Sequence, residues 1–283
     1  MNKIFLSEEG IFPITKESDG NLLKCKPATG LSFSGTIQGE GKLAGIPSLF
    51  VRLAGCNLSC IWKLPNGNLS KCDTYYACNR LKNREITIET TVKTIKQNLG
   101  LLKHIVITGG EPLLQKEAVD TLASTLKSET DTHLTLETNG TLFDEKVIKN
   151  FDLISISPKL KNSNPTKEQT ESSSVNLSKL KQYNQKRINI DVLQSFIDMA
   201  NKYDKDIQFK FVVASENEED EIKKDFLGRL KNYTVSDIMI MPLGSTIQEL
   251  EQTQYVAFKM AVKNGWRLSP RLHINLFNNV AGV

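Results

Sequence analysis

The sequence predicts an α/β fold in which about six strands form a partial, open barrel of the (β/α)6 type. After about residue 45, apolar runs of strand length alternate with helix-like stretches. This is the pattern of buried parallel strands joined by helices. Turn or polar residues follow each run directly, as expected where active-site loops leave the carboxyl ends of barrel strands. We therefore favour an open barrel over a doubly wound sheet.

Each element of this fold is predicted by a short stretch of sequence. Strands are expected at 48–55, 104–112, 133–140, 153–158, 207–214 and 237–244. Helices are expected at 86–99, 112–127, 190–203, 216–231 and 246–264. The segments that follow the strands should therefore meet at one edge of the sheet.

Two segments lack a regular pattern. Residues 1–30 show no clear periodicity, and we expect an N-terminal extension there, before a single domain at 31–283. Residues 160–187 are rich in Lys, Asn, Ser, Thr and Gln, which predicts a solvated excursion between strands. A chain of 283 residues is long enough for one large domain with a sizeable core.

Composition excludes several classes of protein. No run approaches the ~20 apolar residues of a membrane span, and the N-terminus MNKIFLSEEG lacks the apolar core of a secretory signal. We therefore expect a cytoplasmic protein with no membrane partner. The net charge is +4, from 36 basic and 32 acidic residues, and no basic stripe accompanies it. This argues against direct binding of nucleic acid.

Four of the five cysteines, Cys56, Cys60, Cys72 and Cys78, lie in one short segment. An odd number of thiols in a reducing compartment argues against a disulfide framework and indicates a metal site or catalysis. Thiolates suit iron–sulfur clusters and zinc, and Cys78 would complete a four-cysteine zinc site. Three ligands would instead leave one iron of a four-iron cluster open. We interpret Cys78 and Cys25 as ordinary small apolar side chains.

The cysteine segment resembles the radical S-adenosylmethionine (SAM) signature, three cysteines spaced C-x3-C-x2-C. Here an Asp-Thr pair follows the third cysteine. The blocks TIQGEGKLAGIPS, LFVRLAGCNLSC and LSPRLHINLFNNVAGV are similar, more narrowly, to those of the 7-carboxy-7-deazaguanine synthase family. The resemblance runs from about residue 32 to the C-terminus. It implies the radical SAM type of open barrel, SAM as cofactor, and a [4Fe–4S] cluster on Cys56, Cys60 and Cys72.

The chain departs from the signature by an insertion. The nine residues KLPNGNLSK, 63–71, separate Trp62 from Cys72, so eleven residues stand between the second and third cysteines where the signature has two. Pro-Asn-Gly-Asn at the centre is strong turn chemistry. We therefore predict a hairpin that returns Cys72 to the other two cysteines, since closing such a loop costs only a few kcal/mol.

The resemblance also implies binding residues, motif by motif. SAM is expected to contact Gly110 and Glu111 of TGGEP, Glu137 of ETNG, and Ser157, Pro158 and Lys159 of SISPK. Thr74 is implied to ligate Mg2+, a hard ion that prefers oxygen ligands. The substrate is expected to contact Ile37, Gln38, Gly39, Glu40, Arg52, Thr108 and the terminal carboxylate of Val283. An amide such as that of Gln38 can pair with a pterin edge, and an arginine such as Arg52 with a carboxylate.

The implied function is a radical SAM lyase of 7-deazaguanine (queuosine-type) biosynthesis. It would convert 6-carboxy-5,6,7,8-tetrahydropterin to 7-carboxy-7-deazaguanine with loss of ammonia. The family further implies a homodimer and an electron donor such as flavodoxin or ferredoxin. Two alternatives stay open: another small radical SAM enzyme such as a glycyl-radical activase, and a zinc-stabilised nucleic-acid-binding module. The activase would not need the set of Gln38, Arg52 and Val283 and would act on a protein partner. The zinc module would be a colourless protein, whereas an iron–sulfur protein purified without oxygen would be brown.

Overall fold

A computed structural model describes residues 3–78, 84–166, 183 and 185–283. Six neighbouring parallel strands form the centre of its sheet: β3 (Pro47–Leu53), β7 (His104–Gly109), β8 (His133–Thr138), β9 (Leu153–Ile156), β10 (Asp206–Val213) and β11 (Ile238–Pro242). Each coincides with one of the six predicted runs, although β3 and β10 begin one residue earlier than predicted, so the predicted α/β fold with parallel central strands is confirmed. Among the described residues the sheet is open, because its outermost strands, β12 (Arg267–Leu268) and β6 (Arg84–Thr87), each pair with one neighbour.

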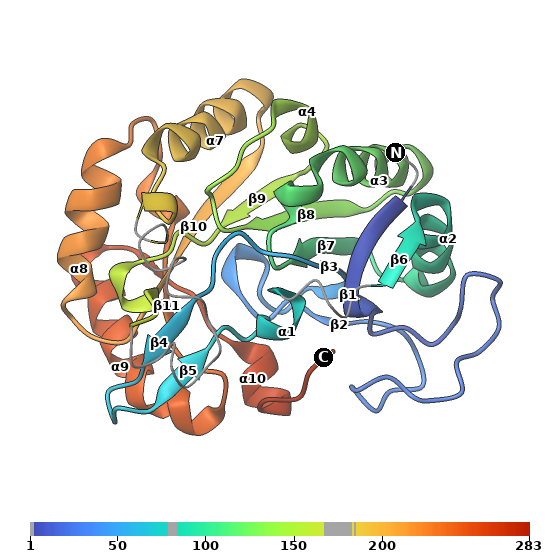
Figure 1. Ribbon diagram of the computed structural model, residues 1–283, viewed down its shortest axis with the longest axis horizontal. Coiled ribbons are helices and arrows are strands. Elements are labelled where there is room, and N and C mark those ends of the chain that lie inside the picture. Colours follow the sequence, from blue (N-terminus) through green and yellow to red (C-terminus); the bar gives the residue numbers. More distant parts are fainter. Residues whose placement is uncertain (1–2, 79–83, 167–182, 184) are drawn as a thin grey trace.

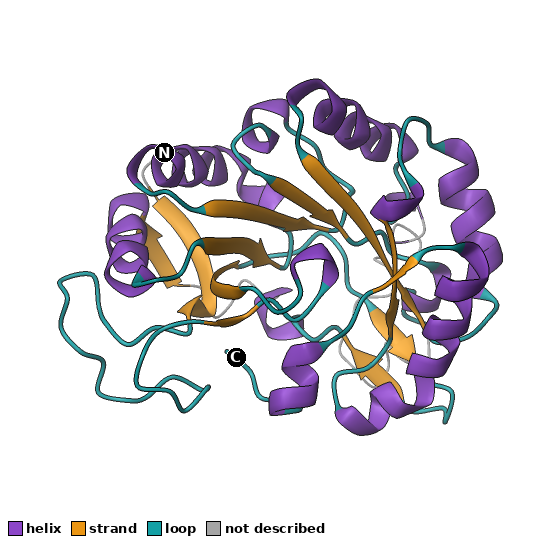
Figure 2. Cartoon of the chain, turned by 180° about the vertical axis from the view of Figure 1, so that it is seen from behind, coloured by secondary structure: helices purple, strands orange, loops and turns teal. Residues whose placement is uncertain are grey.

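Helices cover the outer face of this sheet (Figures 1 and 2). The longer ones are α2 (Ile88–Leu99), α3 (Lys116–Glu129), α7 (Ile190–Tyr203) and α9 (Ile247–Asn264). Short α-helices are α1 (Tyr75–Cys78), α4 (Glu145–Ile148), α8 (Glu218–Glu221) and α10 (Leu272–Phe277). Single turns are η1 (Gly41–Leu43), η3 (Pro112–Gln115), η4 (Lys161–Ser163), η5 (Ile222–Phe226), η6 (Leu227–Arg229) and η7 (Val235–Asp237).

Local chemistry explains where the long helices begin and end. Thr246 accepts a hydrogen bond from the backbone N–H of Glu249 through its hydroxyl, and so caps the start of α9. The helix ends at Gly265, which has a φ of 67°, a conformation that glycine adopts without steric strain. The predicted helix at 216–231 is helical over 218–229, but it consists of three contiguous short pieces: α8, the π-helical η5 and the 3-10 turn η6. The predicted helix at 86–99 begins two residues later than expected, because its first residues end β6.

Residues 3–12 form a strand that the sequence did not predict. This strand, β1 (Lys3–Phe12), pairs antiparallel with both β3 and β6, so it belongs to the main sheet. Its register against β3 shifts between Leu6 and Ile11, where Gly10 has a φ of 60°. This irregularity breaks the alternation of apolar and polar residues by which strands are usually predicted. A long loop then leads from Phe12 to β2 (Thr36–Ile37), which pairs with β3 (Figure 1).

The predicted hairpin in the insertion is confirmed. Strand β4 (Ile61–Lys63) pairs antiparallel with β5 (Leu69–Lys71), with Trp62 opposite Ser70. In the turn, Gly67 has a φ of 88° and donates its N–H to the carbonyl of Leu64 at 2.9 Å. This geometry is that of a type I turn followed by a left-handed glycine. The hairpin therefore brings Cys72 back beside Ile61, next to Cys60.

Most of the predicted excursion at 160–187 lies outside the described residues. The part that is described is less solvated than expected, since Ser163, Tyr183 and Arg187 are buried. None of the described helices is long and apolar enough to cross a membrane.

Candidate active site

One pocket lies at the carboxyl edge of the central strands. Its walls come from the loop after β3, the ends of β7 to β11, the loop that precedes η1, and the last residues of the chain. All but two of the residues predicted from motifs line it, namely Ile37, Gln38, Gly39, Glu40, Arg52, Cys56, Cys60, Cys72, Thr74, Thr108, Gly110, Glu137, Ser157, Lys159 and Val283. The exceptions are Glu111 and Pro158. Segments far apart in the sequence therefore form a single site.

Four thiols, those of Cys56, Cys60, Cys72 and Cys78, line this pocket. Burial raises the pKa of Cys60 to about 12. The pKa of Cys72 is lowered to about 7, chiefly by a hydrogen bond with Cys78 and against the effect of burial. Cys78 is thus part of the thiol group rather than a separate apolar side chain, and Cys25 is exposed. Among the described residues, no group of three or more His, Cys, Asp or Glu side chains is placed to hold a single metal ion.

The glycines of TGGEP bring the end of β7 against the cysteine loop. A Cβ atom on Gly110 would lie 2.3 Å from the carbonyl oxygen of Gly55 and 2.9 Å from the Cβ of Cys56. Gly109 has a φ of 154°, and a Cβ there would lie 2.3 Å from the carbonyl oxygen of Leu53. Only glycine allows so close an approach, so these residues position the thiols.

Glu111 does not line the pocket. Its side chain supports two of the loops that do. Its carboxylate is fully buried and accepts hydrogen bonds from the N–H of Leu113 at 3.0 Å, the hydroxyl of Thr138 at 2.8 Å and the N–H of Asn139 at 2.7 Å. Burial raises its pKa, against these hydrogen bonds. Since Thr138 and Asn139 both line the pocket, Glu111 couples the TGGEP and ETNG loops.

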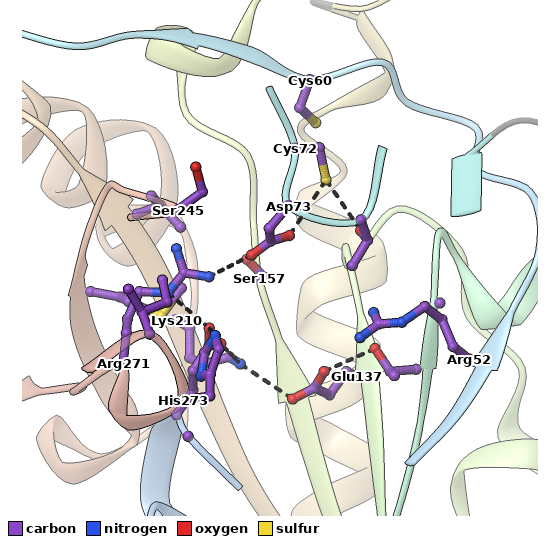
Figure 3. A pocket seen from close by; sticks show the side chains of 18 of the residues that line it. Arg52, Cys60, Cys72, Asp73, Glu137, Ser157, Lys210, Ser245, Arg271 and His273 are labelled. Atoms are coloured by element: carbon purple, nitrogen blue, oxygen red, sulfur yellow. Dashed lines mark hydrogen bonds and ion pairs between the residues drawn. The ribbon is translucent and has the colours of Figure 1, made fainter. Parts of the chain in front are cut away.

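Five charged residues that line the pocket form one group, which we call the charge cluster: Glu40, Asp73, Glu137, Lys210 and Arg271. All of them except Asp73 are largely buried. Lys210 Nζ lies 2.8 Å from Glu40 Oε2 and 3.4 Å from Glu137 Oε1. Arg271 Nε lies 3.1 Å from Glu40 Oε1, and its guanidinium also pairs with Asp73 (Figure 3). Burial opposes ionisation of Glu40, but Lys210 and Arg271 outweigh it and lower the pKa of this carboxyl.

Two residues of the charge cluster, Lys210 and Arg271, were not predicted from the sequence. Lys210 stands in the otherwise apolar run IQFKFVVA, and a lysine in a buried strand is the signal that could have identified it. Its side chain is only 4% exposed. Arg271 belongs to the SPRLH block, which resembles the family's C-terminal block, but no role was predicted for this residue.

The QGEG loop is fixed against the SPRLH block. Gly39 accepts a hydrogen bond from the N–H of Leu272 at 3.0 Å, and a Cβ on Gly39 would lie 2.0 Å from Nδ1 of His273. Gln38 donates from its amide to Glu137 at 3.2 Å, and its amide oxygen accepts from the N–H of Glu40 at 3.1 Å. The first and last motifs of the chain therefore form one wall of the pocket.

Arg52 faces the charge cluster from the other side (Figure 3). Its Nε donates to Glu9 at 2.9 Å, and its guanidinium lies over the ring of Phe12, 4.9 Å from the centroid. Among the described residues its two terminal nitrogens have no hydrogen-bond partner, so they are available to a ligand. On the SAM-facing side predicted from the motifs, Lys159 donates to Ser157 at 2.7 Å.

Comparisons with known proteins agree with this geometry. Residues 51–254 match the model of the radical SAM superfamily. The chain is 34% identical over 252 residues to the 7-carboxy-7-deazaguanine synthase of Halobacterium salinarum, covering 86% of this chain and 88% of that protein. It is 33% identical to that of Rhodopirellula baltica, covering 87% and 85%.

A solved structure supports the fold. The crystal structure of QueE from Escherichia coli aligns with a TM-score of 0.57 at 21% identity, covering 92% of this chain and 93% of that one. The sequence matches over most of the chain, at 33–34% identity, place the protein in a known enzyme family. The chain belongs to the radical SAM superfamily and, within it, to the 7-carboxy-7-deazaguanine synthase family.

Proposed function

We propose that the pocket binds 6-carboxy-5,6,7,8-tetrahydropterin and contracts its ring to 7-carboxy-7-deazaguanine with loss of ammonia. The observation that carries this proposal is the position of the charge cluster and Arg52 in the same pocket as the thiols. A pterin offers a ring edge of N–H donors and acceptors, and the substrate also carries a carboxylate. The pocket offers carboxylates and an amide for the edge, and an arginine with free terminal nitrogens for the carboxylate.

The thiols fit an iron–sulfur cluster, because three soft ligands leave a pocket beside them for a cofactor. We assign Cys56, Cys60 and Cys72 as ligands of a [4Fe–4S] cluster. With SAM, this cluster would supply a 5′-deoxyadenosyl radical by reductive cleavage. Gly110, Glu137, Ser157 and Lys159 line the part of the pocket that we assign to SAM. Because Glu111 is enclosed by its own hydrogen bonds, we assign it a supporting role instead of a SAM contact.

The substrate would be positioned by groups from opposite walls. Gln38 and Glu40 would bind the pterin edge, together with Val283, which also lines the pocket. Thr108 would hold Glu137 through the hydrogen bond of 2.9 Å. Arg52 would hold the substrate carboxylate. The charged groups are held in place before the substrate arrives, which lowers the entropic cost of orienting it.

Mg2+ would bind at Thr74. The hydroxyl of Thr74 lies 3.2 Å from the sulfur of Cys72. A threonine hydroxyl has one proton and two lone pairs, so it can donate to the cysteine sulfur and still offer an oxygen to the ion. We further propose a homodimer and a low-potential electron donor such as flavodoxin or ferredoxin, as the family implies.

The direct test is the reaction itself. The protein is reconstituted with iron and sulfide without oxygen, and incubated with SAM, a reductant, Mg2+ and the carboxy-tetrahydropterin. We expect a product with the mass of the deazapurine acid, and a lower yield when Mg2+ is removed by a chelator. Formation of 5′-deoxyadenosine without this product would refute the substrate assignment and leave only the superfamily.

A further inference from the structure

The hydroxyl of Tyr183 lies against the sulfur of Cys60. Tyr183 Oη is 2.8 Å from Cys60 Sγ, and the two residues are 123 positions apart in the sequence. Both are buried, with Tyr183 4% and Cys60 6% exposed. Tyr183 does not line the pocket, so its hydroxyl reaches the site only through the cysteine.

A third residue orients this hydroxyl. Ser163 donates its proton to the carbonyl of Leu160 at 2.6 Å, and its oxygen lies 3.0 Å from Tyr183 Oη. Because the one proton of Ser163 is already used, Ser163 can only accept from Tyr183. The phenol proton therefore has two possible acceptors, the oxygen of Ser163 and the sulfur of Cys60. A ligand thiolate is negatively charged, and charge-assisted hydrogen bonds are the stronger ones, so the bond to sulfur is favoured once Cys60 binds iron.

The other two assigned ligands, Cys56 and Cys72, have longer hydrogen bonds or a partner that is also assigned to Mg2+. Cys56 receives the N–H of Leu58 at 3.5 Å and the amide of Asn139 at 3.9 Å. Cys72 lies 3.2 Å from the hydroxyl of Thr74, which we assign to Mg2+. Of these contacts, that of Tyr183 is the shortest and the only one made by a side chain from outside the pocket lining.

We propose that Tyr183 raises the reduction potential of the [4Fe–4S] cluster by donating a hydrogen bond to the sulfur of Cys60. Hydrogen bonds to the sulfurs are among the determinants of the potential of such clusters. A donor offsets negative charge on sulfur, which stabilises the reduced, more negative state. Tyr183 is thus a positioning residue that acts through a ligand. This inference rests on the proposed function, since it requires Cys60 to bind the cluster.

The test compares two variants that each lose one phenol oxygen. Tyr183→Phe removes the donor and keeps the ring, whereas Tyr203→Phe removes a hydroxyl that bonds to Glu145 on the outer helices. Each reconstituted protein is titrated without oxygen and followed by electron paramagnetic resonance. We expect a more negative midpoint potential for Tyr183→Phe, with a ratio of reduced to oxidised cluster about tenfold smaller at a given potential, which corresponds to about 59 mV for one electron. Tyr203→Phe should match the unmodified protein.

A second measurement distinguishes the effect of the lost hydrogen bond from any effect of altered packing in the variant. Resonance Raman bands of the iron–cysteine bonds should shift between H2O and D2O in the unmodified protein, and part of that shift should be lost in Tyr183→Phe. An unchanged potential or an unchanged isotope shift would overturn the inference and leave the proposed function intact. Loss of iron from Tyr183→Phe would overturn it too, because the hydroxyl would then serve assembly. If the unmodified protein takes up no cluster, the proposed function itself fails.

Discussion

The two ends of strands β3, β7 and β8 hold their buried polar groups in different ways. At the amino-terminal edge, Ser48 donates to the carbonyl of Ile46 at 2.8 Å and so accepts from Nδ1 of His104 at 2.7 Å. Burial lowers the pKa of His104, so its imidazole is neutral. Because Nδ1 carries the proton, Nε2 accepts from the hydroxyl of Thr135 at 2.8 Å, and both ring nitrogens are satisfied.

The carboxyl edge of the same strands is charged. Glu137 at the end of β8 lies near Lys210, and Arg52 near the end of β3 faces them across the pocket. Burying charges costs free energy that pairing only partly recovers. A neutral network, like the one at the opposite edge, can stabilise a fold at least as well as buried ion pairs. The difference between the two edges supports the proposal that the charges at the carboxyl edge serve binding and chemistry.

The largest expected effect at the carboxyl edge is loss of the iron–sulfur cluster when an assigned ligand is replaced. We expect Cys72→Ala to abolish the near-UV and visible absorbance of the reconstituted protein, because it removes an assigned ligand. Cys78→Ala should keep that absorbance, although Cys78 lies among the thiols. Iron content and absorbance of both variants measure this. The reverse pattern would show that Cys78, and not Cys72, is the third ligand.

The next effect concerns Lys210. Lys210→Met leaves Glu40 and Glu137 with one fewer cation, so we expect a loss of about 3 kcal/mol in the free energy of unfolding. We also expect kcat/KM to fall about a hundredfold, because misplaced groups at the site are costly for catalysis. Urea unfolding and product formation measure the two effects.

A double variant provides the control for Lys210. Lys210→Met with Glu40→Gln removes both partners of the 2.8 Å pair, so most of the stability should return while the activity stays low. If the double variant regained activity as well as stability, the charge cluster would contribute only to the stability of the fold. The two edges of the sheet would then not differ in function.

The sequence was sufficient to predict those elements of the fold that a local pattern of residues specifies. The six central strands were predicted because each is a buried apolar run that ends in a turn. The insertion was predicted as a hairpin because Pro-Asn-Gly-Asn sets the turn by itself. Strand β1 was missed because its pairing is irregular between Leu6 and Ile11, which erases the two-residue period.

The missed site residues depend on contacts between distant parts of the chain. Lys210 acquires its role from Glu40, 170 positions away, and Arg271 from Asp73, 198 positions away. Nothing in their immediate neighbourhood specifies these partners. Glu111 shows the opposite case, since its motif indicated a cofactor contact but the fold encloses its carboxylate. The motifs therefore located the pocket. Which of their residues line it, and which support its loops from outside, depends on the tertiary packing.

A smaller effect should appear at the neutral edge as a dependence on pH. Burial, and to a lesser extent His133, lowers the pKa of His104 to about 4, against about 6.5 in the unfolded chain. Below pH 6.5 the unfolded chain therefore binds a proton that the folded chain excludes, and stability falls as the pH falls towards 4. Between pH 7 and pH 5 this loss is about 2 kcal/mol. In His104→Asn the difference between unfolding free energies at the two pH values should shrink by that amount, and equal differences would contradict the assignment.

The smallest effects come from two matched substitutions, one at each edge. Thr135→Val and Thr108→Val each replace a hydroxyl with a methyl group of similar size, removing the hydrogen bonds to His104 and Glu137. Each should lower the free energy of unfolding by about 1 kcal/mol. Only Thr108→Val should also lower kcat/KM, by about tenfold, because one lost hydrogen bond at the reacting site changes the barrier by about that much. Equal activity of the two variants would mean that the hydrogen bond from Thr108 to Glu137 does not contribute to cofactor binding or catalysis, and that the charge of Glu137 at this edge has another cause.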